Sequence, residues 1–133
     1  MTQGTPAQIL IVEDEAIVAA TLERMLLAAG YRIAGRAAGG REAIEKAVSL
    51  VPDVILMDIM LADEIDGISA SREITRKASI PVIFITSLDD AETIEASRRA
   101  GPFGYIRKPC DERELVIVIE NALYRHQAER ERT

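Results

Sequence analysis

The chain has 133 residues, of which 48% are hydrophobic and only 4% aromatic, and its formal net charge is −6 at pH 7. This length fits one domain with an aliphatic core, and the acidic balance argues against direct nucleic-acid binding, because phosphate contacts need clustered lysine and arginine. A single cysteine and a single histidine exclude an intramolecular disulfide, a cysteine-based zinc site and a multi-histidine metal site. With no membrane-spanning run and no recognisable signal peptide, we expect a cytoplasmic protein without a membrane partner.

Hydrophobic patterning predicts strands and helices that alternate five times after a polar segment, residues 1–7, that we expect to be disordered. The predicted strands are 8–12, 31–37, 53–57, 80–85 and 103–107, and the predicted helices are 15–29, 41–50, 68–77, 89–100 and one that begins after Asp111. Asp14 is expected to cap the first helix and Gly30 to end it. Such alternation predicts a three-layer α/β/α fold with a parallel sheet. The domain is expected to span 8–127, with 128–133 as a helical or frayed tail.

The run Val54 to Met57 is the most apolar of the predicted strands, and it ends in a carboxylate, Asp58. An uninterrupted apolar run is typical of a central strand of a parallel sheet that is covered on both faces. In open parallel sheets the ligand crevice lies outside the carboxyl ends of the strands. We therefore expect Asp58 at the edge of a crevice.

Polar residues also follow three other predicted strands. The first strand leads into Glu13 and Asp14, the fourth leads into Thr86, and Lys108–Pro109 follows the fifth. Taken singly, the Glu13–Asp14 pair and Thr86 are better explained as helix caps, and Lys108 could be an ordinary solvated cation. Their joint occurrence at one predicted sheet edge favours a shared site.

The residue types at this edge indicate phosphoryl chemistry. Three carboxylates would repel one another without a cation, and hard oxygen ligands suit Mg²⁺, which binds through one or two carboxylates together with a phosphate. A lysine and a threonine hydroxyl would suit the remaining phosphoryl oxygens. The predicted reaction is in-line transfer to a carboxylate oxygen, helped by positioning and charge neutralisation.

Five motifs in this order resemble the receiver domain of two-component response regulators. They are ILIVEDE (9–15), VILMDIML (54–61), DG (66–67), FITS (84–87) and GYIRKP (104–109). The resemblance implies a flavodoxin-like fold with five parallel strands in the order 2-1-3-4-5. It also implies that Asp58 accepts a phosphoryl group from a sensor histidine kinase, and that the domain is no independent enzyme but assists its own phosphorylation and dephosphorylation.

The resemblance assigns the metal site as well. Glu13, Asp14 and Asp58 would hold Mg²⁺ together with the backbone carbonyl of Met60. One departure lies beside this site: the loop between Asp58 and the DG pair is one residue longer than is usual in the family and more acidic. We expect kinase docking to differ there.

The remaining roles that the resemblance implies belong to a switch. Lys108 would pair with the phosphoryl group, and its peptide bond to Pro109 would be cis. Thr86 would turn toward the phosphoryl group and Tyr105 would rotate inward, so that phosphorylation shifts the population between two states. Without the family pattern, Tyr105 would be explained as an exposed strand aromatic.

Partners beyond the kinase are not specified by the sequence. The receiver either stands alone and binds a downstream protein, or is the N-terminal part of a longer regulator or a hybrid kinase. A homodimer through the fourth helix, fifth strand and fifth helix is a further hypothesis. The enzyme alternative is a Mg²⁺-dependent phosphatase of the haloacid-dehalogenase type, which is disfavoured because Met60 stands where that class needs a second aspartate.

Overall fold

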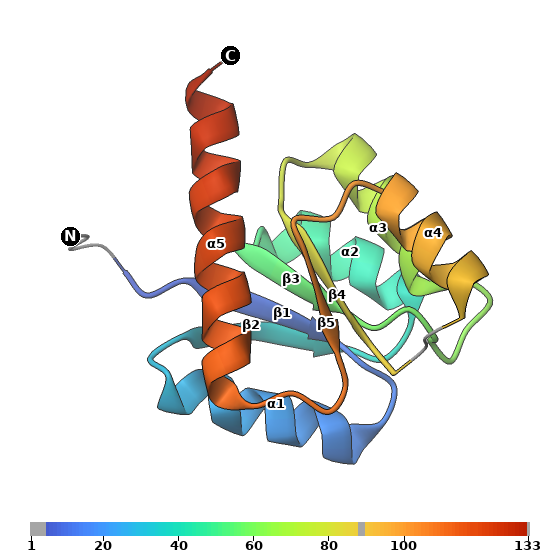
Figure 1. Ribbon diagram of the computed structural model, residues 1–133, viewed down its shortest axis with the longest axis horizontal. Helices are drawn as coiled ribbons and strands as arrows, with labels where there is room; N and C mark the ends of the chain where they lie inside the picture. The colour runs from blue at the N-terminus through green and yellow to red at the C-terminus, as the bar shows by residue number, and fades with distance from the viewer. Residues whose placement is uncertain (1–4, 88–89, 133) are drawn as a thin grey trace.

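Strands and helices alternate from Gln8 to Glu131 in the computed structural model, which describes residues 5–87 and 90–132 (Figure 1). The strands are β1 (Gln8–Val12), β2 (Arg32–Ala37), β3 (Val54–Met57), β4 (Val82–Thr86) and β5 (Gly104–Arg107). The helices are α1 (Ala16–Ala28), α2 (Gly40–Leu50), α3 (Gly67–Lys77), α4 (Ala91–Arg99) and α5 (Glu112–Glu131).

The five strands form one parallel sheet in the order β2-β1-β3-β4-β5. The predicted three-layer fold and its strand order are therefore confirmed. The central strand β3 is buried at every position, which explains its unbroken run of apolar residues. The edge strand β2 is only partly buried, and this agrees with its more polar sequence.

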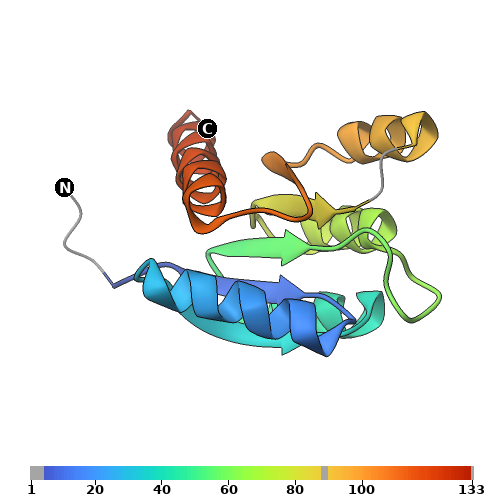
Figure 2. The same ribbon diagram turned by 60° about the horizontal axis from the view of Figure 1, so that its bottom comes forward.

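Helices cover both faces of the sheet (Figure 2). Successive side chains of a strand point to opposite faces, so Ile9 and Ile11 of β1 pack toward α1 and α5, whereas Leu10 and Val12 pack toward α2 and α3. The core thus consists of two aliphatic clusters separated by the sheet. Helix α4 contributes little to either cluster, and Ser97 is its one buried residue among those described.

Helix boundaries agree with the prediction to within two residues, but one predicted cap is wrong. Helix α1 follows Glu15 at the N-cap position, and no side chain caps it. Asp14 does not cap the helix, because its carboxylate lies with those of Glu13 and Asp58 at the strand ends. Gly30 does follow the helix end, with φ of 98° in the left-handed region that favours glycine.

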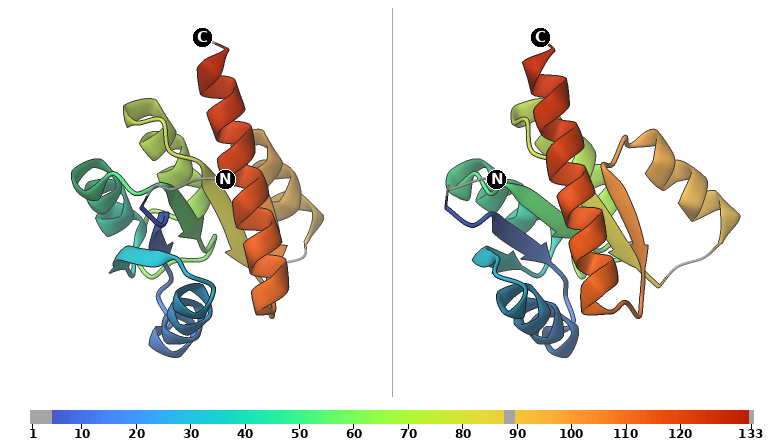
Figure 3. Two further views of the ribbon diagram at one scale, coloured as in Figure 1. Left: turned by 90° about the vertical axis from the view of Figure 1, so that its left-hand side faces the viewer. Right: turned by 60° about the vertical axis from the view of Figure 1, so that its left-hand side comes forward.

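Helix α5 is longer than the core requires, and its last turns extend beyond the strands (Figure 3). Residues 128–131, predicted as a tail, continue the helix without a break. Arg125 donates to the Phe103 carbonyl oxygen (3.1 Å), and a ring nitrogen of His126 lies 2.9 Å from the Ser79 hydroxyl. These contacts hold the helix against the loops at the amino ends of β4 and β5.

Two expectations concern residues that the structure does not describe. Residues 1–4, most of the segment predicted to be disordered, lie outside the described ranges. So does residue 89, the first residue of the predicted fourth helix. Within 5–87 and 90–132, no helix combines the length and the apolar character needed to cross a bilayer.

A buried tyrosine ties α5 to the loop before β2. The Tyr31 hydroxyl donates a hydrogen bond to the Glu120 carboxylate, and the ring lies in the cluster beneath α5. Burial, aided by the hydrogen bond and the negative charge of Glu120, raises the pKa of Tyr31 well above its usual value. The phenol is therefore held in its protonated form.

Replacing Tyr31 by phenylalanine is expected to lower the free energy of unfolding by about 1 kcal/mol at pH 7, since it removes one hydrogen bond and leaves the ring in place. Urea denaturation measures the loss. The exposed Tyr124 supplies the matched control, because Tyr124→Phe removes a hydroxyl that faces solvent.

The pKa shift gives this difference a pH dependence. The folded-state pKa of Tyr31 is raised, so its stabilising contribution is fully present below about pH 10, the unfolded value, and is lost as the pH rises further. The stability difference between wild type and Tyr31→Phe should therefore shrink above pH 10. A constant difference up to pH 11 would show that the hydroxyl is not held protonated.

Candidate functional site

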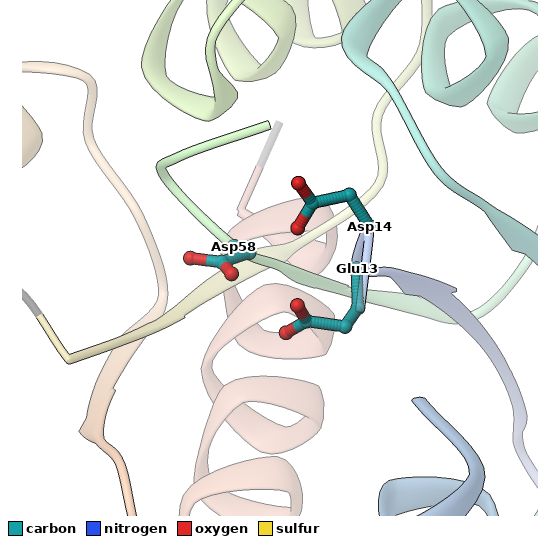
Figure 4. A group of neighbouring side chains, drawn as sticks. All are labelled: Glu13, Asp14 and Asp58. Atoms are coloured by element: carbon teal, nitrogen blue, oxygen red, sulfur yellow. The ribbon is translucent and has the colours of Figure 1, made fainter. Parts of the chain in front are cut away.

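Three carboxylates gather at the carboxyl ends of β1 and β3 (Figure 4). Glu13 and Asp14 follow β1, Asp58 follows β3, and one oxygen from each lies within 4.8 Å of the others. The two strands are neighbours, and the Asp58 backbone N–H donates to the Val12 carbonyl oxygen (3.0 Å), which holds the strand ends side by side. Glu13 and Asp58 are buried, whereas Asp14 is exposed.

Lys108 reaches the same group from the loop that follows β5. Its Nζ lies 2.6 Å from Glu13 Oε1 and 2.9 Å from Asp58 Oδ2. Its backbone N–H donates to the Thr86 carbonyl oxygen (2.9 Å), and its peptide bond to Pro109 is cis. One ammonium group therefore bridges carboxylates that come from two different strands.

The charges in this group shift one another's pKa values. Burial and the neighbouring Asp58 raise the pKa of Glu13, although the hydrogen bond from Lys108 opposes the rise. Burial alone would lower the pKa of Lys108, but hydrogen bonds and attraction to Glu13 and Asp58 outweigh it, so that this pKa is raised. Lys108 is thus held as a cation, and it offsets only part of the negative charge around it.

The donor set fits Mg²⁺. All three candidate ligands are carboxylates, the hard oxygen donors that this ion prefers, and they form the one such group among residues 5–87 and 90–132. The open side of the group is formed by Asp14, the exposed member, so an ion there could keep water ligands. Met60, whose carbonyl is the fourth expected ligand, lies two residues after Asp58, and its backbone N–H is 3.4 Å from Asp58 Oδ1.

The two residues assigned to the switch lie on the adjoining strands. Thr86 is the last residue of β4 and is buried. Tyr105 pairs with Phe84 across β4 and β5, and its ring packs against the cluster beneath α2 and α3. Its hydroxyl oxygen is buried without a hydrogen-bond partner within the described part of the chain. The explanation of Tyr105 as an exposed strand aromatic is therefore wrong.

One residue near the site was missed by the sequence analysis. Asp63, in the long loop after Asp58, accepts hydrogen bonds from the backbone N–H groups of Gly40 and Arg41 at the start of α2. The signal was present in the sequence, because α2 begins at a Gly-Gly pair that offers no capping side chain. Pairing this helix start with a carboxylate 23 residues away required the tertiary structure.

Comparison with known proteins identifies the family. The profile of the response regulator receiver domain matches residues 9–120. The chain belongs to this family. The receiver therefore carries the phospho-accepting function of a response regulator, and the structure and relatives offer no support for the phosphatase alternative.

Among curated proteins, the transcriptional regulatory protein PdtaR of Mycobacterium tuberculosis is 38% identical over 122 residues, which cover 92% of this chain and 59% of that protein. A protein-glutamate methylesterase/protein-glutamine glutaminase of Archaeoglobus fulgidus is 38% identical over 105 residues, which cover 77% of this chain and 30% of that protein. The receiver thus spans about three fifths or less of these relatives.

Solved structures show the same fold. The signal receiver domain of a modulated diguanylate cyclase from Desulfovibrio desulfuricans G20 has a TM-score of 0.89 at 39% identity, covering 93% of this chain and 98% of that one. The response regulator domain of Thermotoga maritima CheB has a TM-score of 0.81 at 32% identity, and the match covers 90% of this chain and 97% of that one. The match extends over nearly all of both receivers.

Magnesium binding at the acidic group is testable by thermal unfolding. At a Mg²⁺ concentration ten times the Kd, binding should stabilise the receiver by about 1.4 kcal/mol, or roughly 5 °C in Tm. Asp14→Asn should abolish the shift, because it removes the charge of the exposed ligand. Sodium chloride at matched ionic strength is the control, and an equal shift in the variant would exclude this site.

Proposed function

We propose that this receiver accepts a phosphoryl group on Asp58 from a sensor histidine kinase and thereby switches a surface that binds a partner. The observation that carries the proposal is the placement of the Lys108 ammonium between the Glu13 and Asp58 carboxylates, at 2.6 and 2.9 Å. A buried nucleophile beside a fixed cation and further carboxylates suits phosphoryl transfer, which depends on positioning and charge neutralisation.

The residues have distinct roles in this reaction. An oxygen of Asp58 attacks the phosphorus in line while the bond from phosphorus to the kinase histidine breaks. Lys108 stabilises the negative charge of the phosphoryl oxygens, and it exchanges one of its carboxylate contacts for them. Mg²⁺, held by Glu13, Asp14, Asp58 and the carbonyl of Met60, would neutralise charge between the carboxylates and the phosphoryl group.

Two further residues, Thr86 and Tyr105, would form the switch. Thr86 stands at the end of β4, the neighbour of β3, where its hydroxyl can donate a hydrogen bond to a phosphoryl oxygen. Tyr105, on the strand beyond, already has its ring partly buried and its hydroxyl without a partner in the described residues. Phosphorylation would select the arrangement in which both residues are held inward. The domain assists its own phosphorylation and dephosphorylation, and the reaction turns over no further substrate.

Two surfaces suit the partners of such a receiver. An apolar groove of about 390 Å³ beside the site, lined in part by Ile17, Met25 and Pro109, suits docking of the kinase. On α5, one of the three elements proposed for a homodimer or an output partner, Ile117 and Tyr124 leave 61% and 74% of their surface exposed. The proposal takes residues 8–127 as the receiver, 128–133 as its C-terminal tail, and the cytoplasm as its location.

The central test is intact-mass measurement after incubation with acetyl phosphate and Mg²⁺. We expect the mass of one added phosphoryl group, which hydroxylamine removes because an acyl phosphate reacts with this nucleophile. Asp58→Asn is the matched control, since it retains the shape of the side chain without a nucleophilic carboxylate. A phosphoryl group that persists in Asp58→Asn, or no added mass in the wild type, would contradict the proposal.

A further inference from the structure

The loop that follows the phosphoacceptor is fastened to the start of a different helix. Asp63 accepts hydrogen bonds from Gly40 N–H to Oδ1 (2.9 Å) and from Arg41 N–H to Oδ2 (3.0 Å). A third backbone group, the Ile65 N–H, lies 3.3 Å from Oδ1. The carboxylate thus joins its own loop to the first turn of α2, and we call this set of contacts the α2 latch.

The α2 latch satisfies groups that α2 cannot satisfy itself. The first N–H groups of a helix have no partner within the helix, and the residue at the N-cap of α2 is Gly39, which has no capping side chain. The carboxylate also interacts favourably with the positive end of the helix dipole. The backbone hydrogen bonds from Arg41 and Gly40 lower the pKa of Asp63, which keeps the side chain ionised.

The loop after β3 and the start of α2 lie so close together that Gly39 and Gly40 have no room for a side chain. A Cβ added to Gly39 would lie 2.8 Å from the Asp63 carboxylate, and one added to Gly40 would overlap the Ile65 carbonyl oxygen. Side chains at these positions would push the loop away from α2. The neighbouring ion pair of Arg41 and Glu64 is exposed, and such pairs contribute little, so the loop is anchored chiefly by Asp63.

The same loop is tied to the phosphoacceptor at its other end. Met60 N–H is 3.4 Å from Asp58 Oδ1, and Gly67 N–H donates to the Ile59 carbonyl oxygen (2.8 Å). Only two residues separate Met60 from Asp63. The path of the backbone between Asp58 and α3 is therefore held from both sides, at the site and at α2.

We infer that Asp63 is a positioning residue for the phosphoryl-accepting site: by latching the loop to α2, it holds the Met60 backbone beside Asp58 and strengthens Mg²⁺ binding. This inference rests on the proposed function, in which that backbone supplies a carbonyl ligand. Residues that orient metal ligands affect affinity about 10- to 100-fold when replaced. The latch acts through the loop, so its effect belongs at the lower end of that range.

Coupling between the two sites must be reciprocal. If the latch strengthens Mg²⁺ binding, then Mg²⁺ must strengthen the latch. Hydrogen exchange of the Gly40 and Arg41 backbone amides should consequently slow when Mg²⁺ is added to the wild-type protein. A carboxylate that only stabilises the start of α2 would leave these amides unaffected by the ion.

The test is a Mg²⁺ titration by isothermal calorimetry on the whole chain and its variants. Asp63→Ala should weaken Mg²⁺ binding about tenfold, and Asp63→Asn, which retains one acceptor oxygen, should give an intermediate Kd. Gly40→Ala disturbs the latch from the side of α2, by pushing the loop away, and should weaken Mg²⁺ binding although the Asp63 side chain itself is retained. The Asp63 variants weaken the contact from the loop after β3, and Gly40→Ala weakens the same contact from the start of α2.

The matched control is Asp53→Ala. Asp53 also accepts a backbone hydrogen bond from a distant segment, from Gln8 N–H at 2.7 Å, but at the opposite end of the sheet. It should lose stability without a change in the Kd for Mg²⁺. Urea denaturation of each variant separates loss of stability from loss of metal affinity.

The outcomes separate the inference from the proposed function. An unchanged Kd in Asp63→Ala, with wild type that binds Mg²⁺ and takes up a phosphoryl group, overturns only the inference. Wild type that neither binds Mg²⁺ nor accepts a phosphoryl group overturns both. If Asp63→Ala does not fold, Gly40→Ala and the amide exchange of the wild type decide: slower exchange with Mg²⁺ supports the latch, and unchanged exchange refutes it.

Discussion

The contact of the Lys108 ammonium with the Glu13 and Asp58 carboxylates is the interaction on which the site depends. Two buried carboxylates that approach each other would repel strongly in a medium of low dielectric constant, and burial would drive one of them to take up a proton. The cation from the loop after β5 offsets part of this repulsion. It leaves a group that is still net negative, which is the condition under which a divalent cation and then a phosphoryl group can bind.

The sheet makes this contact available, because a parallel arrangement brings the carboxyl ends of all its strands to one edge. Glu13, Asp58 and Lys108 are separated by up to 95 residues in the sequence, yet each needs only a short step from the end of β1, β3 or β5. The aliphatic clusters on the two faces fix the strands in register. The positions of the site residues therefore depend on the packing of the core. Helix α4 buries little and contributes little to fixing these positions.

The loop between β3 and α3 connects the site to the start of α2, which contributes no residue to the proposed reaction. Its length and acidity were visible in the sequence, but the partner of Asp63 was not, because a carboxylate can satisfy any nearby pair of free N–H groups. The local rules for helix caps misjudged Asp14 for a related reason. An aspartate just before a helix is a good cap by these rules, whereas the family resemblance assigned Asp14 to the metal site, and its carboxylate does lie with those of Glu13 and Asp58.

The sequence by itself determined the alternation of strands and helices, the central place of Val54–Met57 and the residue types at the strand ends. These follow from local patterns: an unbroken apolar run is stable only when both faces are covered, and Gly30 ends a helix through its own backbone freedom. The tertiary structure alone decided which carboxylates share Lys108, how Tyr105 is buried and which N–H groups Asp63 binds. Those contacts join segments far apart in the chain, and their geometry depends on the packing of the whole sheet.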